Sequence, residues 1–289
     1  MADAELSVQA ALAEAALRLA AASDTPRLDA ELLMAHALGV DRARLLLDPP
    51  RGIVPAAFEE LVERRLRHEP VAYIVGHRAF WTIDLTVGPG VLIPRPDSET
   101  LIEAAVAHFG ARSPRRILDM GVGSGALLLA ALAEWPGATG LGVDLSMAAL
   151  EIARANAERL GMADRAWIER GSWDSASSGE YDLVLCNPPY VEAGAELPRD
   201  VADYEPASAL YAGADGLDEY RRIAPALRLP PGGVACIEIG SKQAQSVRTL
   251  FELVGLYTEV AKDLAGRDRC VVVRPAHDFP LESSEGATK

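Results

Sequence analysis

The stretch that decides the fold is ILDMGVGSGALLLAAL, residues 117–132. It begins like a short buried strand and ends like an apolar helix. The turn between the two has the pattern D-x-G-x-G-x-G, in which glycines allow unusual φ angles and let the backbone approach a ligand closely. In an open parallel sheet, a turn of this kind lies at the carboxyl edge, where ligands bind.

An acidic residue follows at the same predicted edge. Asp144 ends the next strand-like segment, twenty-one residues after Gly123, and an acid at this place can accept hydrogen bonds from both hydroxyls of a ribose. The two features predict a nucleoside ligand. Spacing alone leaves three interpretations open: adenosylmethionine, a dinucleotide bound by a looser G-x-G-x-x-G whose last position is Ala126, or a turn with only a structural role.

A third motif is YDLVLCNPPY, residues 181–190. An apolar strand is predicted to stop at Asn187, because Pro188 and Pro189 cannot donate to a sheet and hold the backbone in a stiff, extended form. A strand that simply enters a surface loop is the alternative interpretation. Beside the glycine turn, this loop would supply hydrogen-bond acceptors and nothing suited to hydride transfer, which favours adenosylmethionine over a dinucleotide.

The segments around these motifs predict the domain organisation. Residues 1–70 have helical periodicity, and the charges within 59–67 are typical of a solvated helix face. Residues 71–95 alternate between apolar and polar and predict a β-hairpin linker. Strand-like and helix-like segments alternate over 96–275, which predicts a Rossmann-like α/β domain with a mostly parallel sheet. Residues 276–289 are typical of a disordered polar tail.

Composition narrows the class of partner. The chain has 289 residues and a formal net charge of −14, so we expect no general affinity for nucleic acids or anionic membranes. It has no signal-peptide pattern or spanning stretch, and we expect a cytoplasmic protein. Cys186, Cys236 and Cys270 each lie in an apolar strand-like run without a CxxC pair, which predicts buried thiols and no metal site.

Together these motifs resemble the HemK/PrmC family, the release factor glutamine N5-methyltransferases. The resemblance extends over about residues 5–274. The combination is more specific than Asn-Pro-Pro-Tyr alone, which DNA adenine methyltransferases share. It rests on EPVAYIVGHRAFW (69–81), LIPRPDSETLIE (92–103), ILDMGVGSGALLL (117–129), YDLVLCNPPYV (181–191) and YEPASALYAGADGLDEYRRI (204–223).

The resemblance implies a helical substrate-recognition domain, a hairpin linker and a class I methyltransferase domain whose last strand is reversed. It implies adenosylmethionine as cofactor and peptide chain release factors as protein substrates, methylated on the glutamine of a Gly-Gly-Gln tripeptide. Arg95 and Glu205 match family motifs without an assigned role. The implied cofactor-binding residues are Gly121, Val122, Gly123, Ser124, Gly125, Asp144, Trp173 and Asn187, and Trp173 is expected near the adenine. The implied substrate-binding residues are Asn187, Pro188, Pro189 and Tyr190. Of these, the resemblance implies a catalytic role for Asn187, Pro188 and Tyr190.

The chemistry expected of this loop follows from the weak nucleophilicity of a carboxamide nitrogen. The Asn187 side-chain oxygen and the Pro188 carbonyl can accept its two N–H groups, while Tyr190 can pack against the amide plane and exclude water. No strong base is required, because a protonated N-methyl amide is very acidic.

Three alternative functions stay open. A ribosomal-protein glutamine methyltransferase shares most motifs, although PRPD favours the release factor branch. A DNA adenine-N6 methyltransferase would need base flipping and a phosphate-binding face. A non-enzymatic module that only senses adenosylmethionine is the third.

Overall fold

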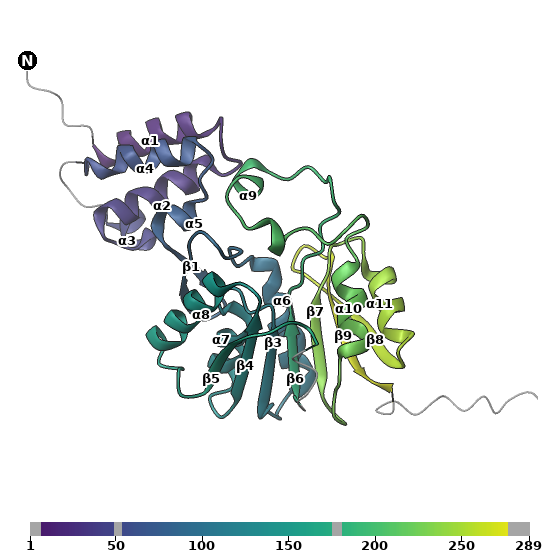
Figure 1. Cartoon of the computed structure of the whole chain (residues 1–289). Coiled ribbons are helices and arrows are strands. Elements are labelled where there is room, and N and C mark those ends of the chain that lie inside the picture. Colours follow the sequence, from purple (N-terminus) through teal and green to yellow (C-terminus); the bar gives the residue numbers. More distant parts are fainter. Residues whose placement is uncertain (1–6, 49–53, 175–180, 277–289) are drawn as a thin grey trace, which may run out of the picture. The chain divides into compact units, whose positions relative to one another are not determined.

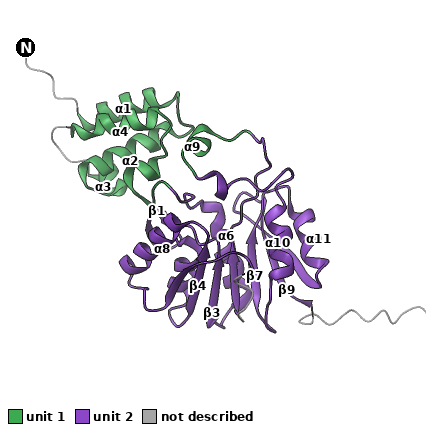
Figure 2. Ribbon diagram, viewed as in Figure 1, with its two compact units in different colours: residues 1–77, 87–89, 196–205 green, residues 78–86, 90–195, 206–289 purple. Residues whose placement is uncertain are grey.

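The computed structural model describes residues 7–48, 54–174 and 181–276. Except for Ala276, the predicted tail at 276–289 lies outside these residues. The chain divides into two compact units (Figure 2), one of residues 1–77, 87–89 and 196–205 and the other of residues 78–86, 90–195 and 206–289. Each unit is described separately.

The first unit is helical, with an apolar core. Ser7 begins its first helix by accepting a hydrogen bond from the Ala10 N–H, and Pro26 begins the second. Leu12, Leu33 and Met34 are fully buried in its core. Its helices are α1 (Val8–Leu19), α2 (Pro26–Leu38), α3 (Arg42–Leu47), α4 (Ala57–Leu66), α5 (Val71–Val75) and α9 (Arg199–Ala202).

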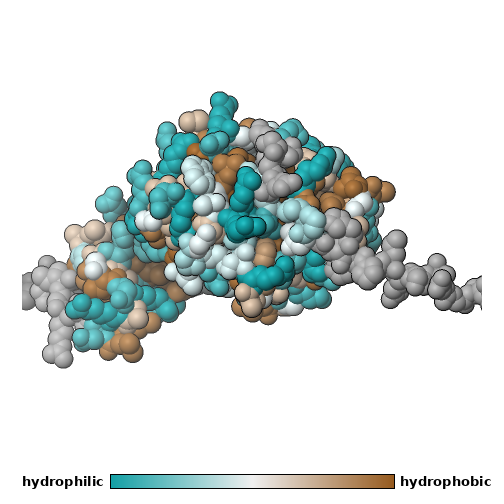
Figure 3. All heavy atoms as spheres, turned by 90° about the horizontal axis from the view of Figure 1, so that it is seen from below, coloured by the Kyte–Doolittle hydropathy of each residue, from teal (hydrophilic) through white to brown (hydrophobic). Residues whose placement is uncertain are grey.

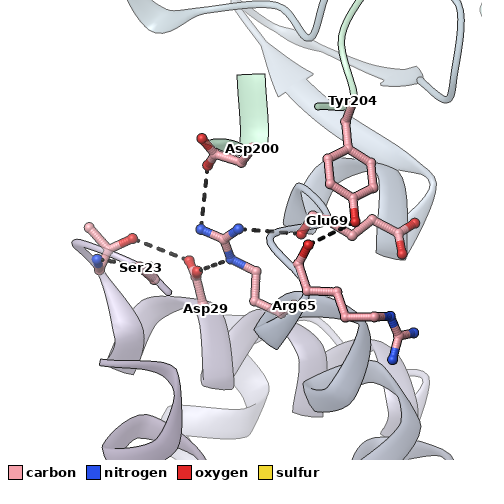
Figure 4. Close-up of polar contacts among 8 residues, drawn as sticks. Ser23, Asp29, Arg65, Glu69, Asp200 and Tyr204 are labelled. Carbon is pink, nitrogen blue, oxygen red and sulfur yellow. Dashed lines mark hydrogen bonds and ion pairs between the residues drawn. The ribbon is translucent and has the colours of Figure 1, made fainter. Parts of the chain in front are cut away.

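A buried ion pair joins distant segments of this unit (Figure 4). The Arg65 Nε donates to Asp29 at 2.7 Å, and Arg65 also pairs with Asp200 at 3.4 Å. The Tyr204 hydroxyl donates to the Arg67 carbonyl at 2.8 Å. The segment 196–205 is therefore fastened to α4. The expectation of a fully solvated charged face on this helix is wrong at Arg65, whose side chain is only 7 % exposed because it meets these carboxylates.

The range 71–95 contains a shorter hairpin than expected. Residues Val71–Val75 form α5, which follows Pro70 and ends at Gly76 with φ +81°. Two strands come next, β1 (His77–Phe80) and β2 (Ile83–Thr86), which pair in a two-stranded sheet. Between them, Trp81 adopts φ +53° and donates its backbone N–H to Glu99 at 2.8 Å. The apolar run before Gly76 is thus a helical turn, although its composition also suits a strand.

The second unit is a doubly wound α/β domain (Figure 1). Its seven strands lie in the order β5-β4-β3-β6-β7-β9-β8, and β9 runs antiparallel to both of its neighbours. This confirms the predicted Rossmann-like class and its reversed last strand. The strands are β3 (Arg116–Met120), β4 (Thr139–Asp144), β5 (Ala166–Arg170), β6 (Leu183–Cys186), β7 (Val234–Glu238), β8 (Leu256–Lys262) and β9 (Asp268–Pro275).

Helices cover this sheet and bury its apolar side chains. Tyr220 and Phe251 are fully buried against the sheet residues, and all three cysteines are free and buried, as predicted. The helices are α6 (Glu99–Phe109), α7 (Ala126–Glu134), α8 (Met147–Arg159), α10 (Asp218–Ala226) and α11 (Ala244–Glu252), with 3-10 turns at Pro96–Ser98 and Ala207–Ala209.

The surface is mixed in polarity. On the face drawn in Figure 3, hydrophilic side chains lie among scattered hydrophobic ones, as is normal for a folded chain. Among the described residues, no helix has the length and apolar character needed to cross a bilayer.

Candidate active site

The glycine turn between β3 and α7 forms one wall of a pocket in the second unit. Gly121 and Gly125 adopt φ +78° and +88°, which side chains other than glycine rarely tolerate. A Cβ on Gly125 would lie 2.9 Å from Leu129, and one on Gly121 would lie 3.2 Å from the Trp173 ring. The turn therefore needs glycine, as its pattern predicts, and its backbone is open to the pocket.

Asp144 lies against this turn at the end of β4. One carboxylate oxygen accepts the Gly123 N–H at 3.0 Å, and the other accepts the Ser146 N–H at 2.9 Å. The predicted acid and the predicted loop thus meet in one wall, and both line the pocket. Each oxygen keeps a further lone pair, so the carboxylate can also accept a ligand hydroxyl.

Asp119 also lines the pocket, and no role was predicted for it. It is 1 % exposed; its Oδ2 accepts the Leu128 N–H at 3.0 Å, and its Oδ1 has no partner among the described residues. Burial raises the pKa of this carboxyl to about 8. The signal was its place as the first residue of the glycine pattern, ahead of a turn that faces a ligand.

The Asn-Pro-Pro-Tyr loop reaches the same pocket from β6. Asn187 and Pro189 line it, and Asn187 donates its Nδ2 hydrogen to the Ser98 hydroxyl oxygen at 3.3 Å. Pro188 is buried and does not line the pocket. Tyr190 directs its hydroxyl to Glu238 at 3.2 Å, so its ring belongs to the domain core instead of the pocket wall. Burial also raises the pKa of the Tyr190 hydroxyl well above its usual range.

Trp173 lines the pocket beside the glycine turn, with its indole N–H donated to Glu219. Val122 and Ser124 of the turn are lining residues as well. All the predicted cofactor residues except Gly125, which begins α7 behind the turn, therefore line one pocket. Nothing in the composition identified the other contributors, which come from motifs whose role was open: Pro94 and Ser98 of the Pro-Arg-Pro-Asp stretch, and Pro206 and Ser208 of the Glu-Pro stretch.

The chemistry of the pocket is that of oxygen acceptors, backbone N–H groups and apolar side chains. Within the described residues, no group of three or more His, Cys, Asp and Glu side chains could hold a metal ion. An aromatic ring, a carboxylate with free lone pairs and an unpartnered buried carboxyl suit a nucleoside that carries a cationic group.

Comparisons with known proteins match both the helical part of the chain and part of the α/β domain. Residues 10–76 match the PrmC N-terminal domain, and residues 97–203 match the methyltransferase small domain. The catalytic domain of human Mettl16 in complex with an RNA hairpin has a TM-score of 0.53 at 17 % identity, over 68 % of this chain and 77 % of that one, which shows the shared fold.

Relatives of known name extend over most of the chain. The release factor glutamine methyltransferase of Rhodospirillum rubrum is 45 % identical over 89 % of this chain and 82 % of its own length. The enzyme of the same name from Caulobacter vibrioides is 42 % identical, over 90 % of this chain and 92 % of its own. At this identity and coverage, the chain belongs to the family of release factor glutamine methyltransferases.

Proposed function

We propose that this protein transfers a methyl group from adenosylmethionine to the side-chain amide nitrogen, N5, of the glutamine in the Gly-Gly-Gln motif of peptide chain release factors. One observation carries the proposal: Asn187 lines the same pocket as Gly121 and Asp144. An amide-binding loop and a nucleoside-binding turn therefore open onto one space. The proposed substrate places the reaction in the cytoplasm.

The pocket residues suit adenosylmethionine in three respects. The glycine turn leaves room where a Cβ would meet Trp173. Asp144 offers lone pairs to the ribose hydroxyls, and the unpartnered Asp119 oxygen offers a buried acceptor to the ammonium group, whose positive charge would lower the raised pKa of this carboxyl. When bound, adenosylmethionine supplies an electrophilic methyl group on a sulfonium. Gly121, Val122, Gly123, Ser124, Gly125, Asp144 and Trp173 are the residues that we propose to hold it.

The loop residues would orient the acceptor amide. The Asn187 side-chain oxygen, at the pocket wall, accepts one N–H of the substrate glutamine, which aims the nitrogen lone pair at the methyl group. Such orientation can contribute on the order of 7–11 kcal/mol to the rate. The same oxygen stabilises positive charge as it develops on nitrogen. Tyr190 supports the loop from behind, and Pro189 closes the wall of the pocket.

Substitution of Asn187 tests these roles. In Asn187→Ala, methyl transfer to a purified release factor should fall by about 10²-fold or more, because one preorganised electrostatic partner is lost. Affinity for adenosylmethionine, measured by calorimetry, should change little. A release factor with Gln→Glu in its Gly-Gly-Gln motif is the substrate control and should accept no methyl group. Loss of cofactor affinity together with turnover would contradict the separation of roles.

A further inference from the structure

Asn187 and Tyr190 are supported by side chains from three other segments of the second unit. Ser98, at the start of α6, accepts from the Asn187 Nδ2 at 3.3 Å. Glu238, at the end of β7, accepts the Tyr190 hydroxyl on Oε1 at 3.2 Å; its Oε2 is buried without a hydrogen-bond partner among the described residues, and the neighbouring Ser98 hydroxyl lowers the pKa of this carboxyl, as a donor to it would. Gln243 donates to the Tyr190 carbonyl at 3.0 Å. The Ser98 hydroxyl therefore lies between the Asn187 amide and the Glu238 carboxyl, which keeps one oxygen free to accept its proton.

The register between two strands of the sheet brings Asn187 and Glu238 together. Strands β6 and β7 are parallel, with Cys186 opposite Ile237, so the residues that follow them, Asn187 and Glu238, end side by side. Ser98 and Glu238 are 3 % and 1 % exposed. Because water does not reach them, their hydrogen-bond directions are determined by one another.

The direction of each bond decides which end of the Asn187 amide faces the pocket. Ser98 has one hydroxyl proton. If that proton is donated to the Glu238 carboxylate, the Ser98 oxygen can only accept, and the Asn187 NH₂ group must turn toward it. The Asn187 oxygen then points away from Ser98 and is available to accept an N–H. The opposite orientation would present an N–H donor to the donor hydrogens of a substrate amide.

We propose that Ser98 and Glu238 are positioning residues that fix the side-chain amide of Asn187 with its oxygen toward the substrate glutamine. The inference rests on the proposed function and assigns a purpose to two buried polar residues, Ser98 at the pocket wall and Glu238 behind it. The Asn-Pro-Pro-Tyr loop supplies the acceptor, and the chain from Glu238 through Ser98 selects its orientation.

The orientation of the Asn187 amide depends on the charge of Glu238. A protonated Glu238 can donate to Ser98, which frees the Ser98 hydroxyl to donate to the Asn187 oxygen and turn the amide. Burial raises the pKa of Glu238 to about 7, against the opposing effects of its hydrogen bonds and the nearby Arg269. The competent orientation should therefore be lost as the pH falls below about 7.

The other groups around Glu238 do not titrate near pH 7. Arg269 stays charged, and it pairs with Asp97 at 3.0 Å and with Asp263 at 3.4 Å. Burial raises the pKa of the remaining neighbours, which stay neutral at this pH: Tyr190, Tyr220, Cys186 and Cys270. Among the carboxyls of the described residues, Asp119 in the pocket wall also has a raised pKa, so the rate is measured with adenosylmethionine at saturation.

The experiment compares Ser98→Ala, Ser98→Thr and Glu238→Gln with the unmodified protein, using a purified release factor and adenosylmethionine. Ser98→Ala should lower kcat roughly tenfold, as expected for loss of one orienting hydrogen bond, while KM for the release factor and Kd for adenosylmethionine stay within about twofold. Ser98→Thr retains the hydroxyl and should keep most of kcat. A merely structural role would not separate kcat from KM and Kd in this way.

The pH profile supplies an independent readout. In the unmodified protein kcat should rise with pH through an inflection near 7, and in Glu238→Gln this inflection should be absent. If Ser98→Ala does not fold, the pH profiles of the unmodified protein and Glu238→Gln test the inference by themselves. Suppose that the unmodified protein transfers methyl groups. If kcat were then unchanged in Ser98→Ala, or if Glu238→Gln had the same pH profile of kcat as the unmodified protein, only this inference would be overturned. Absence of methyl transfer by the unmodified protein would overturn the proposed function and this inference together.

Discussion

Gly216 offers a sharp test of how precisely the Asn-Pro-Pro-Tyr loop must be held. It adopts φ +69°, and a Cβ built on it would lie 2.3 Å from the Tyr190 carbonyl oxygen and 2.8 Å from the Gln243 Nε2. Ordinary contacts of a Cβ begin near 3.4 Å. In Gly216→Ala the Tyr190 carbonyl, or the segment of Gly216, must therefore move by about 1 Å, the difference between these distances.

Two costs follow from this substitution. The positive φ disfavours alanine by about 1–2 kcal/mol, and the contact with Tyr190 displaces the loop that carries Asn187. A displacement of about 1 Å in a positioning element can lower a rate by on the order of 10²-fold. Gly255→Ala is the matched control, because Gly255 has φ +81° and no atom within 4 Å of its Cβ position.

The assay measures kcat for methylation of a release factor, together with urea unfolding of both variants. We expect the positive φ to lower the free energy of unfolding by a similar amount in both variants. The contact with Tyr190 should lower it further in Gly216→Ala. Only Gly216→Ala should lose turnover, while its affinity for adenosylmethionine persists. If kcat of Gly216→Ala were within about threefold of that of Gly255→Ala, the claim that the Tyr190 carbonyl controls the loop would be refuted.

Three further substitutions probe other parts of the chain. Asp144→Ala should weaken adenosylmethionine binding at least about tenfold by calorimetry, through loss of charged hydrogen bonds; unchanged affinity would contradict the ribose contact. Arg65→Met should lower the free energy of unfolding by about 3–5 kcal/mol in urea, because it leaves the Asp29 carboxylate buried without its partner; a loss below about 1 kcal/mol would show that the pair is not needed. The Asp119 carboxyl has a pKa of about 8 in the folded protein, against an ordinary value of 3.8. The unfolded chain therefore loses the Asp119 proton at a lower pH than the folded protein does, so the free energy of unfolding falls as the pH rises from about 4 to 8. Asp119→Asn should reduce that fall, and an identical pH profile of stability would count against the buried, protonated carboxyl.

The parts of the site that are local in sequence were predictable. The glycine turn, Asp144 and the end of β6 each follow from a short pattern, and parallel strands bring their carboxyl ends to one edge of the sheet. The reversal of the last strand was expected only from family resemblance, and its place between β7 and β8 comes from the structure. No short pattern contains that information.

Contacts between distant segments could not be read from the chain. Ser98 meets Asn187 across 89 positions, and Arg65 meets Asp29 and Asp200 across 36 and 135. Arg65 has the charged neighbours of a solvated face, and only tertiary packing shows that it is buried. Tyr190 was expected against the substrate, but Glu238 from a neighbouring strand draws its hydroxyl into the core.

The central claim is that this pocket methylates a protein glutamine, and mass spectrometry of a purified release factor after incubation with the protein and adenosylmethionine tests it most directly. We predict one added methyl group, located by fragmentation on the Gly-Gly-Gln glutamine. A release factor that stays unmodified, or is methylated at another residue, by a preparation that binds adenosylmethionine in calorimetry would contradict the account.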